Sequence, residues 1–315
     1  MTISILRTAE HWWFETASGA VPIRTDASTT AQLLESIDSL SEQLGAPAES
    51  PTSVNDLALV SPVTTPCRVV AQMTNFASHA RDAGLDPDNL APTFFRKTSG
   101  SICGPFDDIV KPAHTSLLDY EVEIGIVFRR AVPVGTVITA ENIGHYAAGL
   151  VVTNDVSARD IQLPKTQYYE AKSYPTFTPI GPRLVLLDHA DWARFDALRL
   201  QLWVNGQIRQ DGLVAGDMIS SPVQALNTLT GFQRLDPGDV LMTGTPVGTA
   251  LSAPPKPIEI IGSLLPPQVK WKAFFKRQAA NPKYLQDGDV VEVRIATDDA
   301  AIDLGRQRST VRFAR

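Results

Sequence analysis

Cysteines, long apolar runs and long basic runs are what this sequence of 315 residues has least of. Its two cysteines, Cys67 and Cys103, are too few for a disulfide framework, which suits a reducing cytoplasm. No apolar stretch is long enough to cross a bilayer, and no export signal is apparent at the N-terminus. The net charge of −6 argues against a nucleic-acid surface. We therefore expect a cytoplasmic protein with no membrane span and no nucleic-acid partner.

The rest of the composition is that of an ordinary globular protein, with 43% hydrophobic and 20% charged residues. The length allows one large core or two domains. Residues 1–65 predict a small module with short strands and a helix at 29–44, where leucines recur at helical spacing. Residues 66–315 form the second predicted domain, and a proline-rich insert interrupts it at about 251–284.

The insert contains a segment in which aromatic residues share one helical face and basic residues surround it. The face comprises Trp271, Phe274, Phe275 and Gln278. A basic amphipathic helix could lie on a membrane. Because this one is short and isolated, we expect it to dock on the core or on a second subunit instead.

The first chemical signal is an alternating stretch at 119–128. Its even-numbered residues are apolar, whereas its odd-numbered residues include Asp119, Glu121 and Glu123, which a strand would place on one face. Like charges on one face repel unless water, a base or a cation offsets them. A short buried strand further along would deliver Asp155 at its end. Hard oxygen donors without nearby Cys or His favour Mg²⁺, Mn²⁺ or Ca²⁺, so we hypothesise a cation held by Glu121, Glu123 and Asp155.

Two structural alternatives to this metal site remain open on the sequence. An alternating strand with acidic residues on one face is commonly a solvated sheet edge. Asp155 could instead be a helix N-cap, and residues 157–160 fit a capping box.

Further polar residues could act on a substrate. His79 and Asp82 stand three apart in a predicted short helix, where a carboxylate could orient an imidazole that acts as a general base. A plain surface pair is the alternative. Lys97 could bind a substrate carboxylate or extend its ammonium group to solvent. The Gly-rich loop within 235–248 could present Thr245 to an anion, but it lacks the lysine and spacing of a nucleotide phosphate loop.

Five motifs in order make the chain resemble the fumarylacetoacetate hydrolase superfamily, in its bacterial acylpyruvate hydrolase-like branch, from about residue 62 onward. They are N-F-x-x-H-A, D-Y-E-V-E, N-D-V-S-A-R-D-I-Q, K-S-Y-x-T-F-x-P-I-G-P and G-D-V-L-M-T-G-T-P-V-G. The resemblance implies an α+β fold, a mixed β-sandwich roll, here with a small N-terminal α/β module. It also implies a homodimer and a site for Mg²⁺, Mn²⁺ or Ca²⁺ at the mouth of the roll.

The resemblance implies a role for each candidate residue. The family's metal ligands correspond here to Glu121, Glu123 and Asp155. The family's substrate-contacting residues correspond to Lys172, Gln162 and Thr245. His79 matches the base of the hydrolytic branch, and Asp82 stands where several members carry the longer glutamate.

The activity that the resemblance implies is hydrolysis of a C–C bond in a 2,4-dioxo acid such as an acylpyruvate. His79, oriented by Asp82, would activate water, and the leaving group would be a metal-chelated enolate that Lys172 also stabilises. Decarboxylation, isomerisation or hydration of 2-oxo acids are alternatives on the same fold. A metal-binding scaffold without turnover is a further alternative, which the retention of these groups disfavours.

Overall fold

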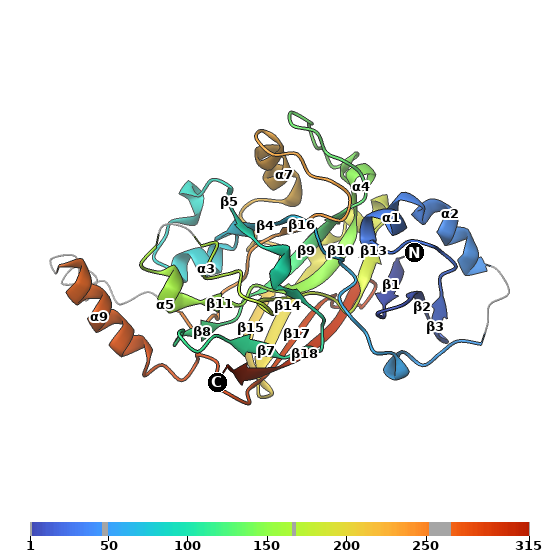
Figure 1. The fold of residues 1–315 in the computed structure, drawn as a ribbon. Helices are drawn as coiled ribbons and strands as arrows, with labels where there is room; N and C mark the ends of the chain where they lie inside the picture. The colour runs from blue at the N-terminus through green and yellow to red at the C-terminus, as the bar shows by residue number, and fades with distance from the viewer. Residues whose placement is uncertain (1, 46–49, 166–167, 252–265, 315) are drawn as a thin grey trace.

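The computed structural model describes residues 2–45, 50–165, 168–251 and 266–314 (Figure 1). Two large β-sheets form its centre. The nine-stranded sheet has, in spatial order, β3 (Gly19–Pro22), β2 (Trp12–Thr16), β1 (Ile3–Arg7), β13 (Leu184–Leu186), β10 (Ala147–Asn154), β9 (Val122–Phe128), β16 (Val240–Met242), β4 (Val69–Met73) and β5 (Thr93–Lys97).

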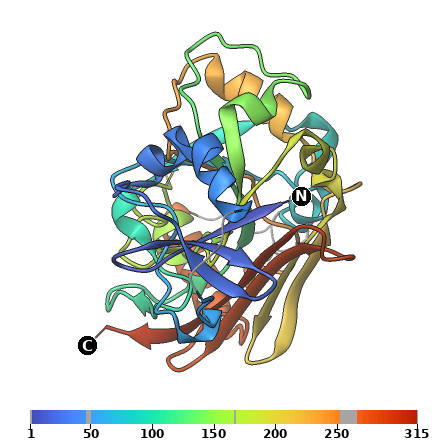
Figure 2. The same cartoon turned by 90° about the vertical axis from the view of Figure 1, so that its right-hand side faces the viewer.

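The five-stranded sheet lies as a second layer, with its yellow and red strands side by side in Figure 2. Its order is β15 (Gln207–Leu213), β14 (Leu198–Val204), β17 (Val290–Thr297), β18 (Asp303–Phe313) and β7 (Ile109–Lys111). Two small ladders join β11 (Ser157–Ala158) to β8 (Leu118–Asp119) and β12 (Thr178–Pro179) to β6 (Ile102–Cys103).

The main hydrophobic core lies between the two sheets, where alternate residues of β9 and β10 face those of β14 and β17. Representative members are Ile124, Val152, Leu200 and Val293, all buried. Short helices lie around the sheets: α1 (Thr30–Glu35), α2 (Ile37–Ser41), α3 (Ala77–Asp82), α4 (Ile143–Tyr146), α5 (Arg159–Gln162), α6 (His189–Trp192), α7 (Pro222–Thr230) and α9 (Pro267–Gln278). This arrangement confirms the predicted α+β fold with packed sheets.

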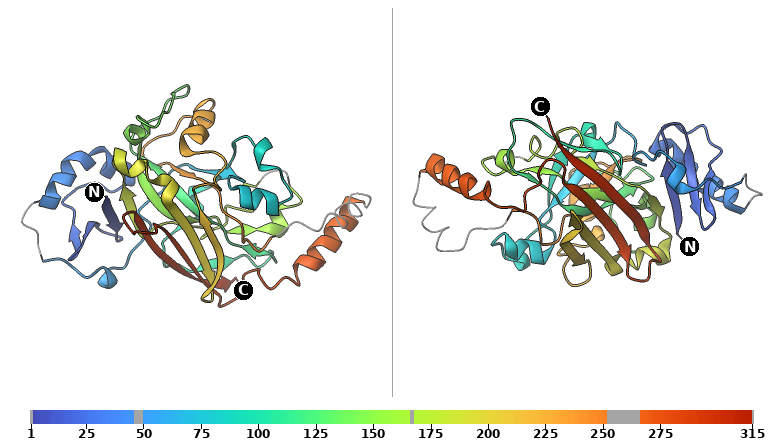
Figure 3. Two further views of the ribbon diagram at one scale, coloured as in Figure 1. Left: turned by 180° about the vertical axis from the view of Figure 1, so that it is seen from behind. Right: turned by 90° about the horizontal axis from the view of Figure 1, so that it is seen from below.

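The N-terminal strands continue the nine-stranded sheet. β1 pairs antiparallel with β13, and Ile5 lies opposite Leu184. Trp12 and Phe14 belong to a second buried cluster that also contains Val151 of β10. Residues from both predicted domains therefore pack together, and the independence of residues 1–65 stays a prediction. Figure 3 shows these strands and α9 at opposite ends of the molecule.

The single helix predicted over 29–44 is broken into α1 and α2. Ser36 caps the end of α1 with a φ of −104°, and its Oγ donates to the carbonyl oxygens of Gln32 and Leu33 at 3.3 and 3.2 Å. A serine side chain that competes for backbone acceptors in this way favours a helix end over a helix interior. Of the leucines in the predicted pattern, Leu33 and Leu34 are buried, whereas Leu44, in the turn that follows α2, is 40% exposed.

A hairpin at Asn205-Gly206, a dipeptide typical of tight two-residue turns, joins β14 to β15. Both residues have positive φ, 51° and 76°, as the tight turn of a two-residue hairpin requires. Among the described residues, no helix has both the length and the apolar character that a bilayer span requires.

Candidate active site

β9 and β10 carry the centre of the site in the middle of the nine-stranded sheet. All seven residues of β9 are buried, because β10 and β16 pair with its two edges and a hydrophobic cluster covers each of its faces. Glu121, just before the strand, and Glu123 within it are 5% and 2% exposed. The solvated-edge alternative is therefore excluded.

Three buried carboxylates meet where β9 begins and the antiparallel β10 ends. Glu121, Glu123 and Asp155 each offer an oxygen, and these oxygens lie within 4.8 Å of one another. The backbone N–H of Asp155 donates to the carbonyl oxygen of Glu121 at 2.8 Å, which ties the two segments together. Asp155 does not cap a helix, since α5 has Ala158 at its N-cap and no side-chain cap bond. The capping alternative is therefore excluded as well.

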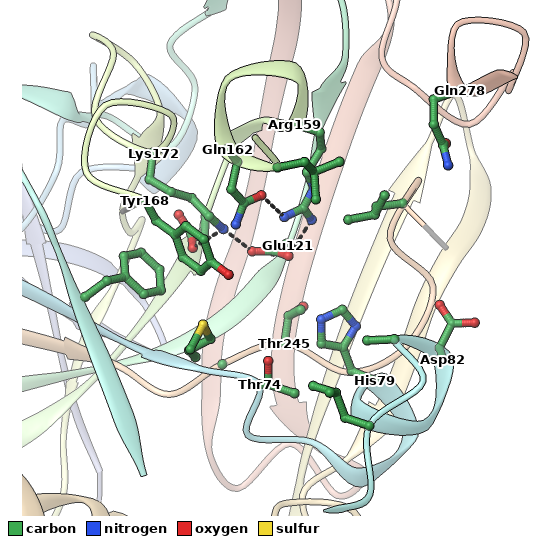
Figure 4. A pocket seen from close by; sticks show the side chains of 18 of the residues that line it. Thr74, His79, Asp82, Glu121, Arg159, Gln162, Tyr168, Lys172, Thr245 and Gln278 are labelled. Atoms are coloured by element: carbon green, nitrogen blue, oxygen red, sulfur yellow. Dashed lines mark hydrogen bonds and ion pairs between the residues drawn. The ribbon is translucent and has the colours of Figure 1, made fainter. Parts of the chain in front are cut away.

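Two buried lysines hold Asp155, and one of them also holds Glu121. The Nζ of Lys172 donates to Asp155 Oδ2 at 2.6 Å and to Glu121 Oε2 (Figure 4). Burial alone would lower the pKa of Lys172, but the charges of Asp155 and Glu121 raise it, so this ammonium group stays protonated. Lys97 donates to Asp155 and, at 2.8 Å, to the carbonyl oxygen of Phe177. Burial lowers the pKa of Lys97 more than Asp155 raises it.

Arg159 is a central residue that the sequence reasoning missed. Its Nη2 donates to Glu121 Oε1 at 2.5 Å, its Nη1 to Gln162 Oε1 at 2.8 Å and its Nε to Asp119 Oδ2 at 2.8 Å. Burial would raise the pKa of Glu121, but Arg159 and Lys172 lower it well below its usual range. The available signal was the three-residue spacing of Arg159 and Gln162, which places both on one helical face.

The residues present fit a divalent cation. Glu123 accepts the Gly244 N–H at 2.8 Å but has no lysine or arginine partner among the described residues. Burial, and then the charges of Asp155 and Glu121, raise the pKa of Glu123 well above its usual value. Crowded carboxylates with one charge unbalanced, and only oxygen donors, suit Mg²⁺, Mn²⁺ or Ca²⁺.

The backbone around Gly244 admits no side chain. Its φ is +87°, and an added Cβ would lie 2.9 Å from Asn75 Cβ. Asn75 is itself fixed, because its Nδ2 donates to the carbonyl oxygens of Ser220 and Thr243 at 3.1 and 2.9 Å. The glycine therefore lets the loop after β16 bring its N–H to Glu123.

A cavity of about 870 Å³ opens onto the three carboxylates, of which Figure 4 labels Glu121. The other predicted site residues that line it are His79, Asp82, Gln162, Lys172 and Thr245. Thr245 Oγ1 accepts a hydrogen bond from Gln210 Nε2 at 2.9 Å, which fixes its position. Lys97 is the exception: it lies behind Asp155 and does not line this cavity.

His79 and Asp82 share the cavity without contacting each other. His79 Nδ1 is buried and has no hydrogen-bond partner in the part of the chain that the structure describes. Figure 4 shows Asp82 at the same end of the cavity with no interaction drawn to the imidazole. Burial lowers the pKa of His79 more than the charge of Glu121 raises it, so the ring is neutral at neutral pH.

Helix α9 of the insert forms one wall of the cavity. Trp271 and Phe274 line it, while Phe275 packs against the main core. The Tyr284 hydroxyl donates to Gln278 Oε1 at 3.1 Å and holds the helix end. The expected docking on the core is seen for this half of the insert, and its residues 252–265 lie outside those described.

Comparison with known proteins places this chain in a family. The model of the fumarylacetoacetate (FAA) hydrolase C-terminal family matches residues 68–312. The chain is 32% identical over 203 residues to oxaloacetate tautomerase FAHD2A, mitochondrial, of Bos taurus, which is 64% of this chain and 62% of that protein. It is 34% identical to oxaloacetate tautomerase Fahd2a, mitochondrial, of Rattus norvegicus, over 64% of this chain and 62% of that protein. The chain thus spans less than two thirds of the length of these relatives.

A solved structure agrees over the whole chain. The probable 2-hydroxyhepta-2,4-diene-1,7-dioate isomerase from Mycobacterium abscessus has 26% sequence identity and a TM-score of 0.73, with 100% of both chains covered. The likeness therefore includes residues 1–65, which the family model leaves out.

Proposed function

The chain belongs to the fumarylacetoacetate hydrolase family, and we propose that it is a divalent-metal-dependent hydrolase that cleaves a C–C bond in a 2,4-dioxo acid, such as an acylpyruvate. The observation that carries the proposal is the meeting of three buried carboxylates, Lys172 and His79 on one cavity. Mg²⁺ or Mn²⁺ is the proposed ion, with Ca²⁺ as a third candidate.

The groups around the three carboxylates would bind the 2-oxo acid end of the substrate. A divalent cation held by Glu121, Glu123 and Asp155 would supply Lewis-acid stabilisation of negative charge on the substrate oxygens. The Lys172 ammonium group would donate to the 2-oxo oxygen, and Thr245 would face the substrate carboxylate. Lys97, which contacts Asp155 rather than the cavity, has a positioning role in this proposal instead of the substrate contact first expected.

The neutral imidazole of His79 can accept a proton and return it later in the reaction. His79 would accept a proton from water, and the resulting hydroxide would attack the C4 carbonyl carbon. The C3–C4 bond then breaks, and its electron pair passes into the enolate of the 2-oxo acid, beside Lys172. Return of the proton to C3 yields pyruvate and a carboxylic acid. Asp82 would enter by approaching the free Nδ1 of His79 when substrate is bound.

Keto–enol interconversion of a 2-oxo acid is the second candidate. Two observations favour it: the relatives named oxaloacetate tautomerase, and the absence of a hydrogen bond between His79 Nδ1 and any described residue. A base that moves a proton at C3 needs no attacking water. The same Lys172 would stabilise the enolate, so the two candidates differ in whether water attacks C4 and the C3–C4 bond breaks.

One assay separates the candidates. Acylpyruvates and oxaloacetate are offered to metal-free, Mg²⁺-loaded and Mn²⁺-loaded protein, and both loss of the 2,4-dioxo absorbance and release of pyruvate are followed. We expect metal-dependent pyruvate release, lost in His79→Ala and kept in His11→Ala, whose ring is 64% exposed. Interconversion of oxaloacetate without pyruvate release from any acylpyruvate would replace the hydrolase proposal with the tautomerase one.

A further inference from the structure

The cavity is much larger than the proposed oxo-acid head requires. A four-carbon 2-oxo acid such as oxaloacetate has nine non-hydrogen atoms. At the roughly 30 Å³ that a water molecule occupies in the liquid, such an acid fills about 270 Å³. The cavity has about 870 Å³. More than half of it therefore remains for another part of a ligand.

The remaining lining is largely apolar, and the apolar part begins beside the head. The ring centroid of Phe95 lies 5.4 Å from Lys172 Nζ and 5.6 Å from the ring of Tyr168. Leu163 and Leu90 also line the cavity. A ligand that leaves Lys172 along this wall meets aromatic and aliphatic carbon. Two cations of the remaining lining, Lys270 and Arg277, stand on α9.

Helix α9 presents two more aromatic rings to the same cavity, and it contacts the rest of the protein through Phe275 and Gln278. Trp271 stacks on Phe275 with ring centroids 5.6 Å apart, and Phe274 meets Trp271 edge-on at 5.8 Å. Because Phe275 packs against the main core, the other two rings are held at the cavity while remaining partly exposed. Exposed aromatic surface at a ligand cavity is stabilised when an apolar group covers it.

We propose that Trp271 and Phe274 of α9, with Phe95 and Tyr168 of the same cavity lining, form a subsite for an aryl or branched apolar tail on the acyl side of the substrate. This inference rests on the proposed function, which supplies the 2-oxo acid head at the carboxylates. A phenyl group moved from water to such a wall corresponds to a gain of roughly ten- to a hundredfold in affinity.

The test is a binding measurement with two ligands that share a head. Calorimetric titration of the Mg²⁺-loaded full chain compares 2-oxobutanoate with 2-oxo-4-phenylbutanoate, neither of which has the 4-oxo group that cleavage needs. The variants are Trp271→Ala/Phe274→Ala and Val269→Ala. Val269 is a matched control because it lies on α9, is 50% exposed and does not line the cavity.

The expected result is a Kd at least tenfold lower for the phenyl ligand in the unaltered chain and in Val269→Ala. The double variant should bring the two dissociation constants together without changing that of 2-oxobutanoate. Equal constants in the unaltered chain, or an unchanged ratio in the double variant, would overturn the tail subsite alone. Failure of both ligands to bind would also overturn the proposed binding of a 2-oxo acid at the carboxylates. A retained ratio without acylpyruvate cleavage would overturn only the hydrolase proposal.

Discussion

The carboxylate end of the cavity and its α9 wall are built in opposite ways. The carboxylates stand on central strands, are almost fully buried, and are held by a network of lysine, arginine and backbone donors. The α9 wall lies at the edge of the molecule on a short helix whose aromatic rings stay partly exposed (Figure 1). Chemistry needs fixed geometry, whereas choice of substrate tolerates variation in a peripheral element. We therefore expect changes at the two ends to have very different costs.

The largest effect on stability should come from Arg159→Met. The change leaves Asp119 and Glu121 buried without their cation, and removal of one partner from such a network costs about 3–5 kcal/mol of unfolding free energy. Urea denaturation measures this. Arg199→Met is the control: Arg199 pairs with Asp298 and Asp211 at the surface, and the loss there should be below about 1 kcal/mol. Equal losses would mean that the buried network contributes no more to the free energy of unfolding than the surface pairs do.

Removal of the unbalanced carboxylate should abolish stabilisation by metal. At a Mn²⁺ concentration one hundred times its Kd, the unaltered chain should gain about 2.7 kcal/mol. Glu123→Gln should gain none, and without metal it should be at least as stable as the unaltered chain, because it removes a charge crowded by Asp155 and Glu121. Thermal melts with and without Mn²⁺ decide this, and Glu10→Ala, 86% exposed, serves as the control. A normal Mn²⁺ shift in Glu123→Gln would remove Glu123 from the ligand set.

A smaller effect is expected at the loop that completes the site. Gly244→Ala combines an unfavourable positive φ with a Cβ contact of 2.9 Å to Asn75, for a cost of about 1–3 kcal/mol. Gly84→Ala shares the positive φ, +77°, but meets nothing within 4 Å, so it should cost less. The two melting temperatures measure the difference. Similar values would show that φ alone, and not the packing around Glu123, sets the cost.

The same contrast explains what could be predicted from the sequence. Alternation at 119–128 indicated a strand and one acidic face, because strand periodicity is local. Burial of that face was not decidable, since it depends on β16, more than a hundred residues later. The contact of Lys97 with Asp155 spans 58 residues and that of Arg159 with Glu121 spans 38. Long-range pairing therefore decided the contacts of both cations. The other residues named from the family motifs line one cavity, and their roles stay predictions.

The smallest effect should be that of Phe274→Ala on stability. A fully buried core side chain such as Ile124 costs about 2–5 kcal/mol when truncated to alanine, because the cavity left behind cannot collapse. Phe274 is only partly buried and faces a space that already exists, so its truncation should cost less than about 1 kcal/mol. Urea denaturation of Phe274→Ala and Ile124→Ala, side by side, gives the ratio. If Phe274→Ala cost as much as Ile124→Ala, α9 would be part of the folding core, and its aromatic rings would be explained by stability rather than by a substrate tail.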